Sequence, residues 1–359
     1  YISLKLAGDD AYLSEKMVGY PAELDEVYAE SFEEQKKEWF SCVGDGIQEC
    51  RNTWEHKKWN ITDLPEFELA ITIDRPELYY DFLQKDWTRF CHDYWKNNFL
   101  EHHTLSKKRV TRIYIGNQFC HNLFPRKKLL FQVLEKALEN NLAVTLAFTY
   151  IRNHLLEEID ELLQELEVWC QSREKEAGKD QEEIIVNDWA MPILLQGKPH
   201  LKPVLGVLLN KRRKDVRLPY KHGIGNHVDS LAENNLNCGF YQDYLKNTFD
   251  IQRFEFESCG YKVTIPDGHH SLHLPFFQTN TSQYCTLYAV CRYGDRGKQK
   301  LPENCPRYCN KKVFLYPKHL KMVGRYNSLF GYDEKILWDE KQLQDYLEQG
   351  IDRIVVNVS

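Results

Sequence analysis

The sequence lacks the long apolar runs that a membrane-spanning helix requires. No run approaches the roughly 18 apolar residues of such a helix, and the first residues, YISLKLAGDD, do not have the pattern of a secretion signal. We therefore expect no membrane span. The 11 cysteines among 359 residues are an odd number and do not resemble a secreted disulfide framework. A reducing cytoplasm fits this cysteine content better.

Positive charge is also not in excess, since the formal net charge is -6. This balance argues against non-specific DNA binding, although it leaves room for a local basic patch. One basic run, KRRKDVR, covers residues 211–217. Most such runs are solvated surface, but Arg212 and Arg213 could hold an anionic substrate because guanidinium groups bind carboxylate or phosphate bidentately.

Two hydrolase motifs are missing from the chain, G-x-S-x-G and H-E-x-x-H. His269, His270 and His273 in DGHHSLH could suggest a zinc site. Neighbours along a strand point to opposite faces, which argues against a shared metal, and we expect these histidines to be polar turn residues. Cys120 has His121 beside it, but adjacent residues rarely form a catalytic dyad.

What the sequence does contain is a cysteine-rich stretch at residues 282–311. Its cysteines are spaced Cys285-x5-Cys291-x13-Cys305-x3-Cys309, among Arg, Lys, Gly and Pro. Two thiolates three residues apart can converge on one metal centre, and a third from a preceding loop would complete most of a site. Sulfur ligands select zinc, copper(I) or iron-sulfur clusters, and the spacing does not choose between them. A disulfide or buried free thiols are the alternatives.

From Phe67 onward, apolar strand patterns alternate with helical patterns. Strands are predicted at 67–73, 110–116, 142–150, 182–188, 202–210, 253–258 and 272–277, and helices from 76 and at 127–141, 154–176 and 241–247. Repeated strand-helix units with continuous apolar strands predict an α/β fold, a TIM-like β/α barrel that is complete or incomplete. The chemistry of such barrels lies at the C-terminal ends of the strands.

Polar residues follow several of these strands. Asn187 and Asp188 follow 182–186, Asn210 follows 202–209, and Glu255 lies on one strand face with Glu257. The alternative interpretation is that Asn and Asp after a strand are turn and cap residues.

The chain divides into four predicted parts. A helical N-terminal extension covers 1–66, the barrel 67–280, a Cys-rich segment 281–330, and a C-terminal helix and strand 331–359.

Five segments together resemble a known family. They are IYIGNQFCHNLFP, EEIIVNDW, RFEFE, LPFFQTNTSQYC and ENCPRYC, in this order within about residues 67–330. They are similar to the collagenase-like peptidase family, whose members include the UbiU and UbiV iron-sulfur proteins of oxygen-independent ubiquinone hydroxylation. The resemblance implies a [4Fe-4S] cluster held by Cys120, Cys285, Cys305 and Cys309, with Cys291 as an alternative to Cys285.

The same resemblance implies an oxidoreductase that hydroxylates or otherwise modifies an aromatic, RNA or peptide substrate without oxygen. Asn187 and Asn210 would then line the substrate pocket, and Asp188 or Glu255 would transfer a proton. A related partner subunit is expected. The alternatives are a peptidase-like hydrolase with a structural metal, and a non-catalytic partner subunit.

Overall fold

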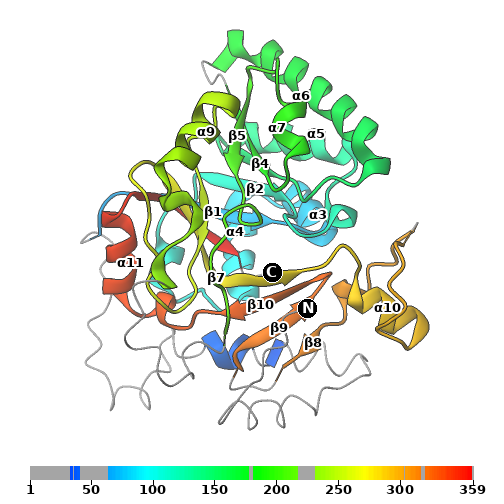
Figure 1. Cartoon of the computed structure of the whole chain (residues 1–359), viewed down its shortest axis with the longest axis vertical. Coiled ribbons are helices and arrows are strands. Elements are labelled where there is room, and N and C mark those ends of the chain that lie inside the picture. The colour runs from blue at the N-terminus through cyan, green and yellow to red at the C-terminus, as the bar shows by residue number, and fades with distance from the viewer. Residues whose placement is uncertain are drawn as a thin grey trace.

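Helices surround one large mixed sheet in this mixed α/β protein (Figure 1). The computed structural model describes residues 33–34, 36–40, 64–177, 181–216, 231–302, 304–316 and 320–357. Most of the predicted extension at 1–66, and Arg217 of the basic run, lie outside this part of the chain.

Eleven strands form the sheet within the described residues, in the order β5-β4-β3-β2-β1-β11-β7-β10-β9-β8, with β6 beside β7. Their bounds are β1 Glu68–Ile73, β2 Arg112–Gly116, β3 Ala143–Ala147, β4 Glu182–Val186, β5 Leu201–Leu205, β6 Glu255–Glu257, β7 His270–Thr281, β8 Phe314–Leu315, β9 Met322–Arg325, β10 Ser328–Tyr332 and β11 Ile351–Asn357. Every strand predicted from the apolar pattern is present, because continuous apolar runs mark strands that are buried on both faces.

The parallel strands include one from the end of the chain. Strand β11 pairs in parallel with both β1 and β7, so it lies in the middle of the sheet. The helix and strand predicted at 331–359 are present as α11 and β11, and β11 lies in the same sheet as the strands of 67–280. Leu205 of β5 also forms a single parallel bridge with Phe254, next to β6.

Strand β7 belongs to two kinds of pairing. Its first half pairs in parallel with β6 and β11, and its second half pairs antiparallel with β10. Strands β9 and β8 continue this antiparallel part. His270 and His273 are buried in β7, so the prediction that they are turn residues is wrong. Side chains are buried on both faces of this part of β7, as in a strand inside a sheet and not as in a turn.

The helices follow the strands as the periodicity predicts. Helix α3 begins with a proline, whose fixed φ suits the first turn, and the Asp86 side chain caps α4 by accepting from Arg89 N. Contacts join α5 to β3, α6 to β5 and α11 to β11. The bounds are α3 Pro76–Gln84, α4 Trp87–Asn97, α5 Lys127–Glu139, α6 Leu156–Ala177, α7 Ala190–Leu194, α9 Gly239–Phe249, α10 Thr286–Tyr293 and α11 Glu340–Glu348, with short 3-10 turns η3 Thr104–Lys107, η4 His121–Leu123, η5 Asn153–Leu155, η8 Asn235–Asn237, η9 Tyr308–Asn310 and η11 Lys335–Leu337.

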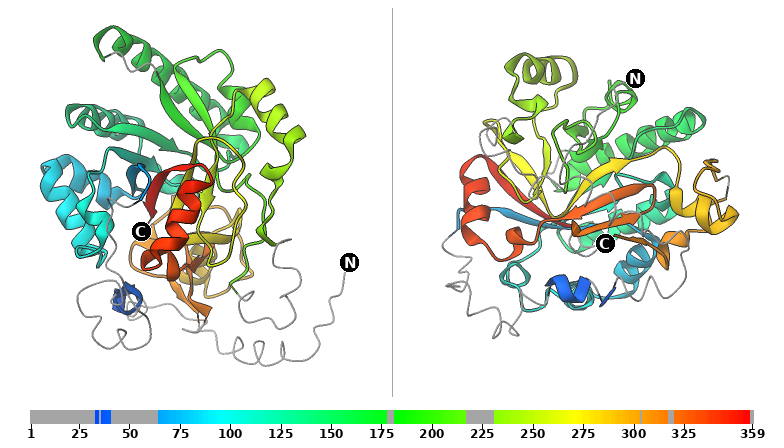
Figure 2. Two further views of the ribbon diagram at one scale, coloured as in Figure 1. Left: turned by 90° about the vertical axis from the view of Figure 1, so that its left-hand side faces the viewer. Right: turned by 60° about the horizontal axis from the view of Figure 1, so that its bottom comes forward.

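Both faces of the parallel strands are buried. One small cluster joins six strands through Ala70, Tyr114, Ala147, Ile185, Val204 and Val355. Their neighbours in the chain point the opposite way into the main core, beneath the helices seen in Figure 2. Ile354 and Val356, for example, flank Val355 and belong to that main core.

The described part of the N-terminal region is a short helical piece. Trp39 stacks on Tyr332 of β10 with ring centroids 4.9 Å apart, and Phe40 is buried against Phe276 of β7. This piece therefore covers the antiparallel part of the sheet. Within the described residues, no helix is both long enough and apolar enough to span a membrane.

Candidate functional site

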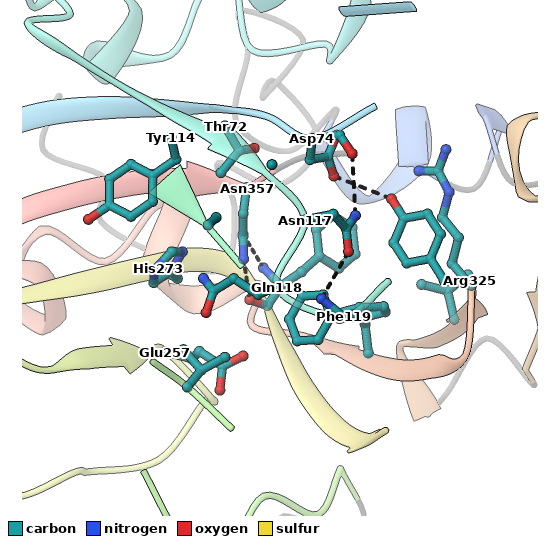
Figure 3. Close-up of a pocket in the computed structure, with 17 residues that line it drawn as sticks. Thr72, Asp74, Tyr114, Asn117, Gln118, Phe119, Glu257, His273, Arg325 and Asn357 are labelled. Atoms are coloured by element: carbon teal, nitrogen blue, oxygen red, sulfur yellow. Dashed lines mark hydrogen bonds between the residues drawn. The ribbon is translucent and has the colours of Figure 1, made fainter. Parts of the chain in front are cut away.

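A pocket of about 50 Å³ lies where the parallel strands end (Figure 3). Thr72 of β1, Tyr114 of β2, His273 of β7 and Asn357 of β11 line it. The residues Val323, Arg325, Tyr326 and Phe330 of the antiparallel part close the other side. We call this the central pocket.

The loop after β2 joins the central pocket to the predicted cysteine ligands. Gly116 ends β2 with a φ of 111°, and a Cβ there would lie 2.6 Å from the Ala147 carbonyl oxygen, so only glycine fits. The Asn117 Oδ1 then accepts hydrogen bonds from the backbone N of Phe119 and Cys120, each at 2.9 Å. The glycine and the asparagine together hold Cys120 in its place.

Four predicted ligand cysteines line one small cavity. Cys120, Cys285, Cys305 and Cys309 all border it, and it measures about 20 Å³. We call it the cysteine cavity. Tyr326 lines both this cavity and the central pocket, so the two are neighbours. Cys291 lies in α10 and does not border the cysteine cavity.

Contacts between distant segments hold these cysteines together. The Arg307 Nε donates to the Asn122 carbonyl at 3.3 Å, which ties the C-x3-C segment to the loop after β2. Cys285 lies at the N-terminus of α10, where its sulfur accepts from Tyr288 N at 3.4 Å. Its thiol also donates to the Tyr326 carbonyl at 3.0 Å.

Burial raises the pKa of three thiols of the cysteine cavity, those of Cys120, Cys285 and Cys309. Burial raises the pKa of Cys120 to about 11 and that of Cys309 to about 12. A metal binds the thiolate, so binding here would release protons.

The residues fit an iron-sulfur cluster by the chemistry of their donors, because four cysteines from three separate segments border one cavity. The fit depends on that donor set and not on free space, since the cavity is small. Among the described residues, no three or more His, Cys, Asp or Glu side chains are grouped so that they could hold a metal ion.

Glu255 is placed behind the central pocket and not in it. Its side chain is fully buried, and it bonds to the Tyr114 hydroxyl at 3.1 Å and to His273 Nε2 at 2.5 Å. His273 and Tyr114 line the pocket, whereas Glu255 does not. Of the two hydrogen-bonded groups, the one that faces the central pocket is therefore His273, and Glu255 holds it from behind.

Asp188 and Asn187 hold loops in place. The Asp188 Oδ1 accepts from the backbone N of Ala190 and Met191, each at 3.0 Å, at the start of α7, and Oδ2 accepts from Ile151 N. Asn187 is buried and donates to the Phe148 carbonyl at 2.7 Å. These bonds are those of turn and cap residues, which was the alternative interpretation of the sequence.

A second pocket of about 490 Å³ lies beside these residues. Asn187, Asp188, Asn210 and Arg212 line it, and Arg213 does not. Arg213 is exposed. The Asn210 Nδ2 donates to the Glu255 carbonyl at 3.1 Å, while its buried Oδ1 has no hydrogen-bond partner within the described part of the chain.

A buried ion pair separates the two pockets. Lys214 of the second pocket bonds to Glu257 of the central pocket and to Gln278 Oε1 at 3.1 Å. Burial lowers the pKa of Lys214, and Glu257 opposes that shift. Lys214 belongs to the basic run that the sequence offered as a possible anion site, but only Arg212 and Arg213 were predicted as its binding residues. Arg212 and Lys214 are two residues apart and both line the second pocket, whereas Arg213 between them does not.

Compared with family models, curated proteins and solved structures, the chain matches none of them. The resemblance to the collagenase-like peptidase family therefore stays a prediction.

Proposed function

We propose that this protein is an iron-sulfur oxidoreductase with a [4Fe-4S] cluster held by Cys120, Cys285, Cys305 and Cys309. The supporting observation is that these four cysteines, from three segments of the chain, line one cavity. The substrate would bind in the central pocket, which shares Tyr326 with that cavity. The reaction class is oxygen-independent hydroxylation or a related modification of an aromatic, RNA or peptide substrate.

We further propose that the parallel strands form a closed TIM-like barrel. The bridge between Leu205 and Phe254, with Leu205 N donating to the Arg253 carbonyl at 3.0 Å, would close the ring of β1 to β7 and β11 between β5 and β6. The location of the central pocket supports this, because barrels of this kind carry their sites at the C-terminal ends of the strands.

When bound, the cluster would supply single-electron transfer. Side chains of the protein would carry out the proton transfer. The Glu255 carboxylate and Nε2 of His273 are hydrogen-bonded, so Glu255 would orient the imidazole for proton transfer at the central pocket. Lys214 would keep Glu257 in position on the opposite side of the central pocket.

The proposal also includes a cellular compartment and a partner for the protein. All nine cysteines of the described residues are free thiols, which supports a reducing cytoplasm. A related partner subunit would be consistent with the resemblance.

Iron and acid-labile sulfide assays on anaerobically prepared protein test the proposal. We expect about four iron and four sulfide per chain in the wild type, because a [4Fe-4S] cluster contains that number of each. Stoichiometric zinc without sulfide would instead indicate the hydrolase with a structural metal.

Cysteine 285 and Cys291 provide a matched pair of variants, six residues apart. Cys285→Ala removes a cysteine that borders the cysteine cavity, and Cys291→Ala removes one that does not. We expect most of the iron and the visible absorbance to be lost in Cys285→Ala and retained in Cys291→Ala. Equal retention in both variants would reject the ligand assignment.

A further inference from the structure

A strongly basic stretch projects from the protein next to the cysteines. Residues 291–312 contain seven Arg or Lys and two acidic residues, in a chain of net charge -6. Residues 292–300 are all exposed, and they form the end of α10 and the segment after it, which Figure 1 shows away from the sheet. We call residues 292–300 the basic lobe.

Aromatic rings connect the basic lobe to the cysteine cavity. The Lys298 Nζ lies 5.9 Å from the centre of the Tyr293 ring, and Tyr293 packs edge-on against Tyr288 with ring centroids 5.9 Å apart. Tyr288 lines the cysteine cavity. A single ring contact, Tyr293 on Tyr288, therefore joins the lobe to the lining of the cavity.

One cysteine of the cavity also borders the surface beyond the lobe. Cys305 lines a wide groove of about 1150 Å³, together with Leu301 and Arg307. The other three cysteines of the cavity do not border that groove. Cys305 is therefore the one cysteine of the cavity that also borders this groove.

We propose that the basic lobe is the docking surface for a small acidic iron-sulfur protein of the ferredoxin type, which reduces the bound cluster. This rests on the proposed function. The carrier would lose one electron and the [4Fe-4S] cluster would gain it, with no bond formed or broken. Opposite charges would steer the encounter and fix the orientation of the carrier. A protein is favoured over RNA because the charge adjoins the cysteine cavity and not the central pocket.

The test uses the full-length, anaerobically reconstituted protein and a purified acidic [2Fe-2S] ferredoxin as the probe. Calorimetry measures binding, and stopped-flow absorbance measures reduction of the cluster by the reduced ferredoxin. The variant is Arg292→Glu/Lys298→Glu/Lys300→Glu. At low salt we expect binding and the second-order rate each to fall about tenfold or more. We also expect the wild-type rate to fall as salt is added.

The matched control reverses three exposed lysines on other elements, Lys107→Glu/Lys246→Glu/Lys341→Glu. Lys246 stands in the last turn of α9 as Arg292 does in the last turn of α10, so the helix-end effects match. The control should bind and reduce as the wild type does. Circular dichroism checks that both triple variants are folded.

The outcomes separate the two proposals. Unchanged binding and rate in the lobe variant, with a cluster present, would overturn the docking surface. Lobe-dependent binding of an RNA 20-mer in place of ferredoxin would overturn it as well. A wild type that assembles no cluster would overturn the proposed function, and calorimetry would still report whether the lobe binds the carrier.

Discussion

At the scale of the residue, His103 makes two hydrogen bonds that require a neutral ring. Its Nε2 lies 2.7 Å from the Leu337 carbonyl oxygen, and its Nδ1 accepts from Leu105 N at 3.1 Å. Burial lowers the pKa of His103 to about 4, against an ordinary value of 6.5. The histidine joins the segment before β2 to the segment before α11, so its titration will affect the stability of both.

The direction of the pH effect follows from where the protons bind. Between pH 6.5 and 4 the unfolded chain binds a proton at His103 and the folded chain does not, so the free energy of unfolding falls as the pH falls. At pH 5 this one group lowers it by about 2 kcal/mol. Denaturant unfolding at pH 7.5 and pH 5 should therefore show a smaller pH dependence in His103→Gln than in the wild type. Equal pH dependence in the two proteins would contradict this role of His103.

At the scale of the element, strand β11 joins the two ends of the described chain, because it pairs with β1 on one side and β7 on the other. Ile354 and Val356 point into the main core and Val355 into the small cluster on the other face. Ile354→Ala should lower the free energy of unfolding by about 2 to 5 kcal/mol, the usual cost of a buried large-to-small change. Lys341→Ala, at an exposed position of α11, should change it by less than about 0.5 kcal/mol. Similar values for the two variants would show that β11 is not central to the fold.

The sequence predicts an element well when its pattern lies within a few neighbouring residues, and poorly when it depends on residues far away along the chain. Strands such as β1 and β4 were predicted because their apolar runs are local. The place of β11 between β1 and β7 was not, because pairing with residues more than 280 positions away leaves no local pattern. In the site, the cysteine spacing and the resemblance pointed to the four cysteines of the cavity. His273 was missed because its partner, Glu255, lies on another strand.

At the scale of the whole molecule, one charged network connects strands that are far apart in the sequence. Arg353 of β11 bonds to Glu183 of β4 at 2.6 Å and to Glu68 of β1 at 2.6 Å. Arg112 of β2 reaches the same two carboxylates, at 3.3 and 3.0 Å. Burial alone would raise the pKa of Glu183, but Arg112 and Arg353 bring it down to about 2.

Removing Arg353 should therefore destabilise the whole fold in a pH-dependent way. In the wild type, Glu183 contributes stability that is present above its ordinary pKa of 4.5 and is lost as the pH falls toward 2. Arg353→Met leaves the buried Glu183 carboxylate with less positive charge beside it. We expect the free energy of unfolding to fall by about 3 to 5 kcal/mol at pH 7. That deficit should shrink toward pH 3, because without Arg353 burial favours the protonated form of Glu183 in the variant, and a neutral carboxyl no longer needs the arginine. Lys127→Met, which breaks the exposed pair with Glu165, should cost less than about 1 kcal/mol at either pH. Urea unfolding of the three proteins at pH 7 and pH 3 measures this, and a deficit that is constant with pH would show that Arg353 acts through packing and not through charge.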